Sequence, residues 1–167
     1  QQKQYILEGL QIFEKEFGFS SASFIAPCNC WDRRIEPTLK TAGVSIIQGN
    51  TTQNIPTGIF GKYEHCKHYF GELNDVGLRY NIRNAFLEPS TNPSKDWVDS
   101  ALNRIQSAFT FGKPAVICSH RINYIGYIDP QNRDRGLRDL KSLLSIVLKK
   151  WPDVKFAHTA QLLDYIG

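Results

Sequence analysis

Several absences in the 167-residue sequence exclude broad classes of protein. The longest apolar runs, such as residues 115–118, fall far short of the roughly 20 residues that a helix needs to cross a bilayer. Lys and Arg are scattered, no run of five or more basic residues occurs, and the net charge is only +4. We therefore expect no membrane span and no nucleic-acid partner.

Methionine is absent, and no charged segment followed by an apolar segment marks a signal peptide. We therefore expect the chain to begin at a processed or truncated point. The four cysteines do not suggest a disulfide framework, because the C-x-C pair of Cys28 and Cys30 bridges poorly and Cys118 lies within an apolar run. The cysteines leave the cellular compartment open, and the sequence does not indicate an oligomeric state.

A content of 41% hydrophobic residues with mixed charge is typical of a globular chain, and we expect residues 1–167 to form a single domain. Helical spacing of apolar residues predicts helices over residues 3–17, 32–43, 96–109, 134–150 and 159–166. Short apolar or alternating segments predict strands over residues 22–26, 44–48, 78–87, 115–119 and 154–156, with a loop over residues 49–62.

Strands and helices alternate along the chain, and apolar strands between amphipathic helices are typical of a parallel sheet covered by helices. With right-handed crossovers, the fold class is α/β, either an open doubly wound sheet or part of a (β/α) barrel. Functional residues in both architectures lie just past the carboxyl ends of the strands. The candidate positions are therefore residues 27–32, 48–52, 88–92, 119–124 and 157–159.

The sequence S-H-R-I-N-Y at residues 119–124 is the sharpest candidate site. His120 directly follows an apolar strand, so its imidazole would lie at the edge of the sheet and could serve as a general acid or base. Arg121 and Asn123 add a fixed charge and an amide nearby. The alternative is a histidine that makes a structural hydrogen bond at a strand end.

Two further strand ends carry candidate residues. Trp31 follows Pro27 in a short loop, and an exposed indole there would stack on a sugar ring. The alternative is a Trp31 that covers the core. Glu88 ends another strand and would act as a catalytic or positioning carboxylate with Arg83 or Asn84 as its partner, unless it is an exposed glutamate without a role.

His65 and His68 flank Cys66 and invite a zinc site. An i, i+3 pair of histidines shares one face only if the segment is helical, and a C-x-C pair is not a usual structural zinc motif. We therefore assign no metal ligand within this chain. Glycine-rich phosphate loops, the G-x-S-x-G elbow and H-E-x-x-H are absent as well.

The order of these segments resembles the carboxy-terminal part of the polysaccharide deacetylase (NodB-like) superfamily. The resemblance extends over residues 1–166 and is carried by K-P-A-V-I-C-S-H-R at residues 113–121 and W-P-D-V-K-F at residues 151–156. It implies an irregular (β/α) barrel with parallel strands and outer helices, of which this chain would be the carboxy-terminal part. It also implies a metal-dependent hydrolase that removes acetyl groups from polysaccharide, in a secreted or periplasmic protein.

Within this resemblance, His120 matches the strand-end histidine that acts as general acid, with Glu88 orienting catalytic groups. The substrate-binding residues would be Trp31, Pro27, Arg83, Arg121 and Asn123. The Asp-Asp and H-x-x-x-H motifs that supply the family's catalytic base and metal ligands are absent. A divalent metal, expected to be zinc, would therefore be held by residues upstream of this chain and not by the chain itself.

Two other functions stay open at the level of sequence. A glycoside hydrolase on the same barrel would use paired carboxylates such as Glu88 and Asp129. A non-catalytic carbohydrate-binding relative would account for the missing metal motifs.

Overall fold

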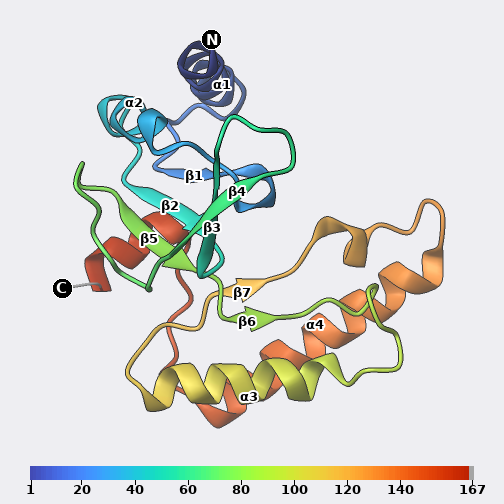
Figure 1. Cartoon of the computed structure of the whole chain (residues 1–167). Helices are drawn as coiled ribbons and strands as arrows, with labels where there is room; N and C mark the ends of the chain where they lie inside the picture. Colours follow the sequence, from blue (N-terminus) through green and yellow to red (C-terminus); the bar gives the residue numbers. More distant parts are fainter. Residues whose placement is uncertain (166–167) are drawn as a thin grey trace. The chain divides into compact units, whose positions relative to one another are not determined.

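The structure is a computed structural model, and it describes residues 1–165 (Figure 1). The chain forms two compact units. Unit 1 contains Gln1–Ile82 and the chain from Ala157 onward, and unit 2 contains Arg83–Phe156. Each unit has its own buried core. The expectation of a single domain over residues 1–167 stays a prediction.

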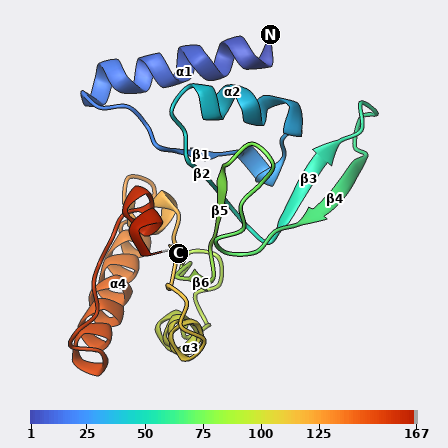
Figure 2. The ribbon, with the colours of Figure 1, turned by 90° about the vertical axis from the view of Figure 1, so that its left-hand side faces the viewer.

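The elements of unit 1 are, in chain order, α1 (Gln2–Phe17), β1 (Ser23–Ile25), η1 (Pro27–Asn29), η2 (Arg33–Ile35), α2 (Glu36–Thr41), β2 (Ile46–Gly49), β3 (Thr52–Pro56), β4 (Tyr63–Lys67), β5 (Arg79–Ile82) and η4 (Thr159–Tyr165). A parallel sheet in the order β1-β2-β5 forms its centre, with Phe24 opposite Ile47 and Ile47 opposite Tyr80. Figure 2 shows α1 and α2 on one side of this sheet and the β3–β4 hairpin extending away from it.

Local signals in the sequence set the ends of the helices in unit 1. α1 ends at Phe17 because Gly18 adopts φ 75°, a left-handed conformation that favours glycine. Asp32 accepts a hydrogen bond from the backbone N–H of Arg34 and so caps η2, which leads into α2.

The core of unit 1 is stabilised by buried apolar side chains, and burying a large one contributes about 1.5–3 kcal/mol. The core is built from Ala26, Trp31, Ile35, Leu39, Val44, Ile47, Leu78, Tyr80 and Ile82, with Ile6 and Leu10 of α1 packed against it.

Residues 49–62 were predicted to be a loop, but they contain β3 and part of the turn of a β-hairpin. β3 pairs antiparallel with β4, with Gln53 opposite Cys66 and Asn54 opposite His65. Gly58 and Gly61 lie between the two strands with φ 83° and 74°, where the chain reverses direction. The prediction was wrong because Thr, Gln and Asn dominate β3, so the apolar alternation that marks a strand is missing.

Unit 2 contains β6 (Ala85–Phe86), α3 (Trp97–Thr110), β7 (Ile117–Cys118), η3 (Arg121–Tyr124) and α4 (Pro130–Lys150). β6 and β7 are parallel neighbours. Asp96 caps α3 by accepting from the N–H of Asp99, and Asp129 caps α4 by accepting from the N–H of Gln131. Apolar residues of β6, α3 and α4 share one core, formed by Ala85, Leu87, Ala101, Ile105, Leu143 and Val147.

Four other predicted elements differ from the structure. The strand over residues 78–87 is interrupted at Arg83 and Asn84, and its two parts, β5 and β6, belong to different sheets. The Asn84 amide bonds the carbonyl of Pro114 and the N–H of Val116, which diverts the backbone. Residues 154–156 are not a strand, and α4 begins four residues earlier than predicted because Asp129 and Pro130 provide its cap and first turn. The last predicted helix is the 3₁₀ helix η4, and Ile166 lies outside the described residues.

The prediction of an α/β fold with parallel strands and helices is confirmed. Within residues 1–165 the strands do not close into a barrel, since they form one three-stranded sheet and two pairs. None of the helices in this described part is both long and apolar enough to cross a membrane.

Candidate acid–base site

Glu88 and His120 are brought together by the register of two short strands. Phe86 of β6 lies opposite Cys118 of β7, and the two strands are parallel. Glu88 and His120 each follow two residues after these partners, so they occupy equivalent positions past the carboxyl ends of the strands. This is the edge at which α/β proteins place functional residues.

A short hydrogen bond joins the two side chains. His120 Nδ1 lies 2.6 Å from Glu88 Oε1, and the backbone N–H of His120 donates to Oε2 at 3.4 Å. The glutamate side chain is only 9% exposed, whereas the imidazole is 66% exposed. Among the described residues Nε2 of His120 has no hydrogen-bond partner. One ring nitrogen is therefore fixed, and the other can exchange a proton with a bound molecule.

Asn123 holds the glutamate in place from within the protein. It is fully buried, and its Nδ2 donates to Glu88 Oε2 at 2.8 Å and to the His120 carbonyl at 2.9 Å. Its Oδ1 accepts from the backbone N–H of Ser90 at 3.0 Å. The sequence places Asn123 among the substrate-binding residues. Because it has no exposed surface, its role in the structure is to position Glu88 and His120.

The close approach of α4 to η3 fixes Asn123 in turn. A Cβ atom at Gly136 would lie 1.9 Å from the Asn123 carbonyl oxygen, well inside van der Waals contact. Asn132 of the same helix donates to the carbonyl of Ile122 at 2.6 Å. Only glycine at position 136 allows this packing, and the backbone of η3 is thereby held against the helix.

Cys118 and Arg83 lie behind the pair. Cys118 Sγ is 4.0 Å from Glu88 Oε1, and Arg83 Nη1 donates to the sulfur at 3.4 Å. Burial raises the pKa of the Cys118 thiol, which therefore stays protonated at neutral pH. Arg83 is half-buried and contacts this cysteine, while Arg121 is exposed beside His120. Of these two predicted substrate-binding residues, Arg121 is the one that a ligand could reach.

The side chains of Glu88, Cys118 and His120 have the donor chemistry of a zinc site, and their ligand atoms lie within 4.8 Å of one another. Their arrangement, however, does not fit a resident ion. Two ligands on one tetrahedral zinc, each bound at about 2.0–2.1 Å, lie about 3.3 Å apart, but Oε1 and Nδ1 share a proton at 2.6 Å. The sulfur also faces the Arg83 cation. The geometry is that of a hydrogen-bonded carboxylate–histidine pair.

The other residues that the sequence suggested as site residues do not belong to the acid–base site. They lie in unit 1 or have a structural role. Trp31 is 5% exposed, and its Nε1 donates to Glu36 Oε1 at 2.9 Å. It covers the core, which is the alternative that the sequence leaves open, and it offers no ring face for a sugar. Pro27 is exposed at the start of η1. Asp129, the second carboxylate of the glycosidase alternative, caps α4.

His65 and His68 point to different surroundings because β4 is extended and the helix that a zinc pair would need is not formed. His65 is exposed and contacts Asn54 Oδ1 at 3.0 Å. His68 is 2% exposed and stacks on Tyr80 with 3.7 Å between ring centroids. Its Nε2 lies 2.9 Å from Gln53 Oε1 and its Nδ1 lies 3.3 Å from Glu72 Oε2. His68 is a packed core histidine.

Sequence reasoning missed the supporting residues of the acid–base site, above all Ser90 and Gly136. The one available signal was an isolated glycine inside the helical pattern of residues 134–150, which costs helix stability unless packing requires it. Comparison with protein-family models, curated proteins and solved structures gives no match. The chemistry of the site is therefore argued from its geometry.

Proposed function

We propose that this chain carries the proton-transfer part of a carbohydrate-active hydrolase of the deacetylase type, with His120 as its general acid. The observation that supports the proposal is the contact of His120 Nδ1 with the buried Glu88 carboxylate at 2.6 Å while two thirds of the imidazole is exposed. The resemblance of residues 113–121 and 151–156 to polysaccharide deacetylases supplies the substrate class. The partial α/β fold would belong to an irregular (β/α) barrel.

In the proposed reaction, water adds to the carbonyl carbon of an acetyl group on a sugar and gives one proton to a catalytic base, which the resemblance places upstream of this chain. The tetrahedral adduct then breaks its bond to the sugar nitrogen or oxygen, and the electron pair of that bond moves to the leaving atom. Protonated His120 gives the Nε2 proton to this atom and keeps its Nδ1–H on Glu88. Such proton transfer contributes typically 10²–10⁴-fold in rate.

The neighbouring residues support this step in distinct ways. The Glu88 carboxylate stabilises the imidazolium and fixes the direction of the ring, as in catalytic histidine–carboxylate pairs. The Asn123 amide donates to Oε2 of Glu88, so that Oε1 is available to bond the histidine. A metal ion, if the intact enzyme uses one as the resemblance implies, would polarise the acetyl carbonyl. Glu88, Cys118 and His120 do not hold it in our proposal.

The test measures acetate release from an acetylated oligosaccharide by the full-length protein and its His120→Ala variant. We expect a loss of at least about 100-fold in kcat. Because His120→Ala also leaves Glu88 Oε1 without its partner, thermal unfolding is measured as well, and kcat is compared at a temperature at which both proteins are folded. His158→Ala is the matched control, since His158 is also exposed and its backbone alone makes a hydrogen bond.

Three results would overturn the proposal. Near-normal acetate release by His120→Ala would remove the histidine from the chemistry. New reducing ends without acetate would favour a glycoside hydrolase, and saccharide binding without turnover would favour a binding protein.

A further inference from the structure

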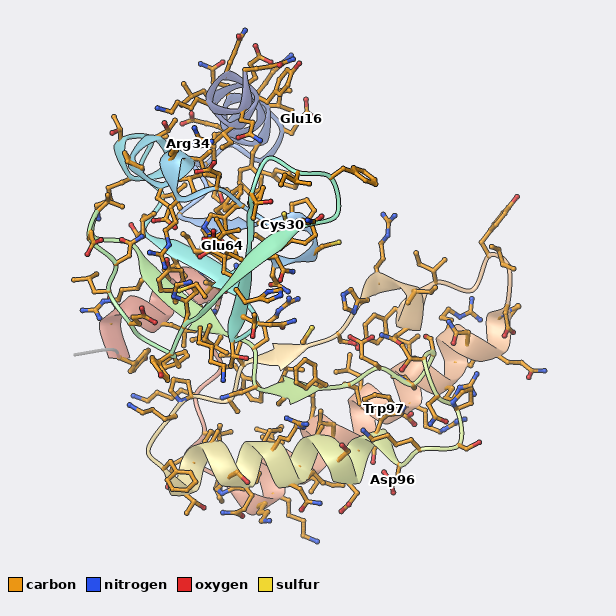
Figure 3. The ribbon with its side chains drawn as sticks, viewed as in Figure 1. Glu16, Cys30, Arg34, Glu64, Asp96 and Trp97 are labelled. Atoms are coloured by element: carbon orange, nitrogen blue, oxygen red, sulfur yellow. The ribbon has the colours of Figure 1, made fainter. Side chains whose placement is uncertain are left out.

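A groove in unit 2 has the chemistry of a second ligand site. It lies between the start of α3 and the exposed side of α4 and has a volume of about 580 Å³, within the range of known ligand sites. Figure 3 shows Asp96 and Trp97 at the start of α3. The groove shares no residue with the Glu88–His120 pair. We infer that it binds a short stretch of a neutral polysaccharide chain.

Trp97 offers the groove an aromatic surface in a fixed orientation. The half-buried indole packs against the core of unit 2, and its Nε1 donates to the carbonyl of Asn92 at 2.9 Å. Lys95 Nζ lies over the ring, 3.9 Å from its centroid. A cation–π contact at an exposed site contributes only about 0.5–1 kcal/mol, so a sugar can displace the lysine and stack its C–H face on the indole.

The charged lining of the groove is balanced, which favours a neutral ligand over an anion or a cation. Its basic residues are Lys95, Arg135 and Arg138, and its acidic residues are Asp96, Asp99 and Asp139. The lining therefore contains both hydrogen-bond donors and acceptors, and Ser142 adds a hydroxyl group. Sugar hydroxyls both donate and accept hydrogen bonds, so they match this mixture.

Arg135 gives an independent indication that the groove is incomplete without a ligand. Its Nε is buried and has no hydrogen-bond partner among the described residues, and Arg135 is one of the residues that line the groove. An unpaired buried donor costs about 1–3 kcal/mol. A small turn of the side chain toward the groove would bring Nε within reach of a sugar oxygen, directly or through a bridging water, and so reduce this cost.

That the groove binds saccharide is inferred from the groove's own residues. What the groove would do for turnover rests on the proposed function. The groove would hold the polymer at a second point, which raises the local concentration of substrate near the enzyme. Loss of the groove would thus weaken action on long chains more than action on a short acetylated substrate.

The test titrates the full-length protein with a neutral tetrasaccharide of N-acetylglucosamine by isothermal calorimetry. We expect Trp97→Ala to weaken binding at least tenfold. Phe111→Ala is the matched control, because Phe111 is an exposed aromatic residue at the other end of α3 and outside the groove. Ser142→Tyr provides a second variant that fills the groove from the exposed face of α4 and leaves the core intact.

The outcomes separate this inference from the proposed function. His120→Ala should bind the tetrasaccharide as well as the unaltered protein does. The groove is not a saccharide site if the unaltered protein fails to bind at about 10 mM, or if Trp97→Ala and Ser142→Tyr both bind with unchanged affinity. If the groove does not bind the tetrasaccharide but acetate release is normal, the inference about the groove is wrong and the proposed role of His120 is unaffected.

Discussion

His68 in unit 1 and His120 in unit 2 have similar partners and opposite properties. Each places Nδ1 beside a glutamate, Glu72 for His68 and Glu88 for His120. The difference lies at Nε2. In His68 this atom contacts the Gln53 amide within the core, and in His120 it makes no such contact and the ring is 66% exposed.

The comparison teaches that a carboxylate partner alone does not mark a catalytic histidine. Gln53 donates its Nε2 to the carbonyl of Trp31, which turns its Oε1 toward His68. With both ring nitrogens engaged and Tyr80 stacked on its face, His68 has no position at which a substrate could receive a proton. The burial of the glutamate and the exposure of the ring together distinguish the site in unit 2.

The largest expected effect comes from replacing the buried carboxylate. Glu88→Gln removes the acceptor that stabilises the imidazolium, and we expect kcat for acetate release to fall by about 100-fold or more. Glu72→Gln is the matched control, because it makes the same change beside the other histidine and should leave kcat unaltered. Equal activities of the two variants would contradict the assignment of roles.

A change that does not touch the pair should disturb it through the backbone. Gly136→Ala places a methyl group against the Asn123 carbonyl, and we expect unit 2 to lose about 3 kcal/mol of stability, at the upper end for overpacking. Urea unfolding measures this loss, and acetate release should fall with it. Gly9→Ala in α1 meets no atom within 4 Å and should be neutral or stabilising by about 0.5–1 kcal/mol.

The buried histidine should matter for stability and not for activity. His68→Ala leaves Gln53 Oε1 without its partner and removes the stack on Tyr80, so we expect unit 1 to lose about 2 kcal/mol. The midpoint of urea unfolding measures the change, and kcat of the folded protein should stay the same. The exposed His65→Ala should change the free energy of unfolding by no more than about 0.5 kcal/mol.

The smallest effect concerns alkaline pH. Burial, followed by the nearby Glu36 carboxylate, raises the pKa of the Tyr80 phenol well above its ordinary value of 10. Unfolded Tyr80 therefore loses its proton above pH 10 while the folded residue keeps it, and the free energy of unfolding falls as the pH rises. We expect a loss of about 1 kcal/mol between pH 9 and pH 11. Tyr80→Phe should remove this component, and Tyr127→Phe, at an exposed residue, should not.

The sequence was most informative where structure depends on neighbours along the chain. α1 ends at Gly18 and α3 begins at Asp96 as predicted, because caps and stop signals act within a few residues. The placement of Glu88 and His120 past strand ends was also predictable from short apolar segments followed by polar residues. The predicted partner of Glu88 was a different residue, because its 2.6 Å contact with His120 depends on the register of β6 and β7.

Features that depend on distant packing could not be predicted. Trp31 is buried because His68 and Tyr80 pack against it from distant parts of the chain. Asn123 is buried because Gly136 brings α4 close to η3. The break between β5 and β6 depends on Asn84 contacting residues beyond α3. In each case the deciding partner is far away in the sequence, and a local pattern does not contain it.

The approach of Gly136 to the Asn123 carbonyl makes the geometry of the Glu88–His120 pair depend on a helix that contributes neither residue. Asn123 donates to Glu88 Oε2, and its backbone lies against α4. A substitution that shifts α4 would therefore change the orientation of the buried carboxylate without touching either member of the pair.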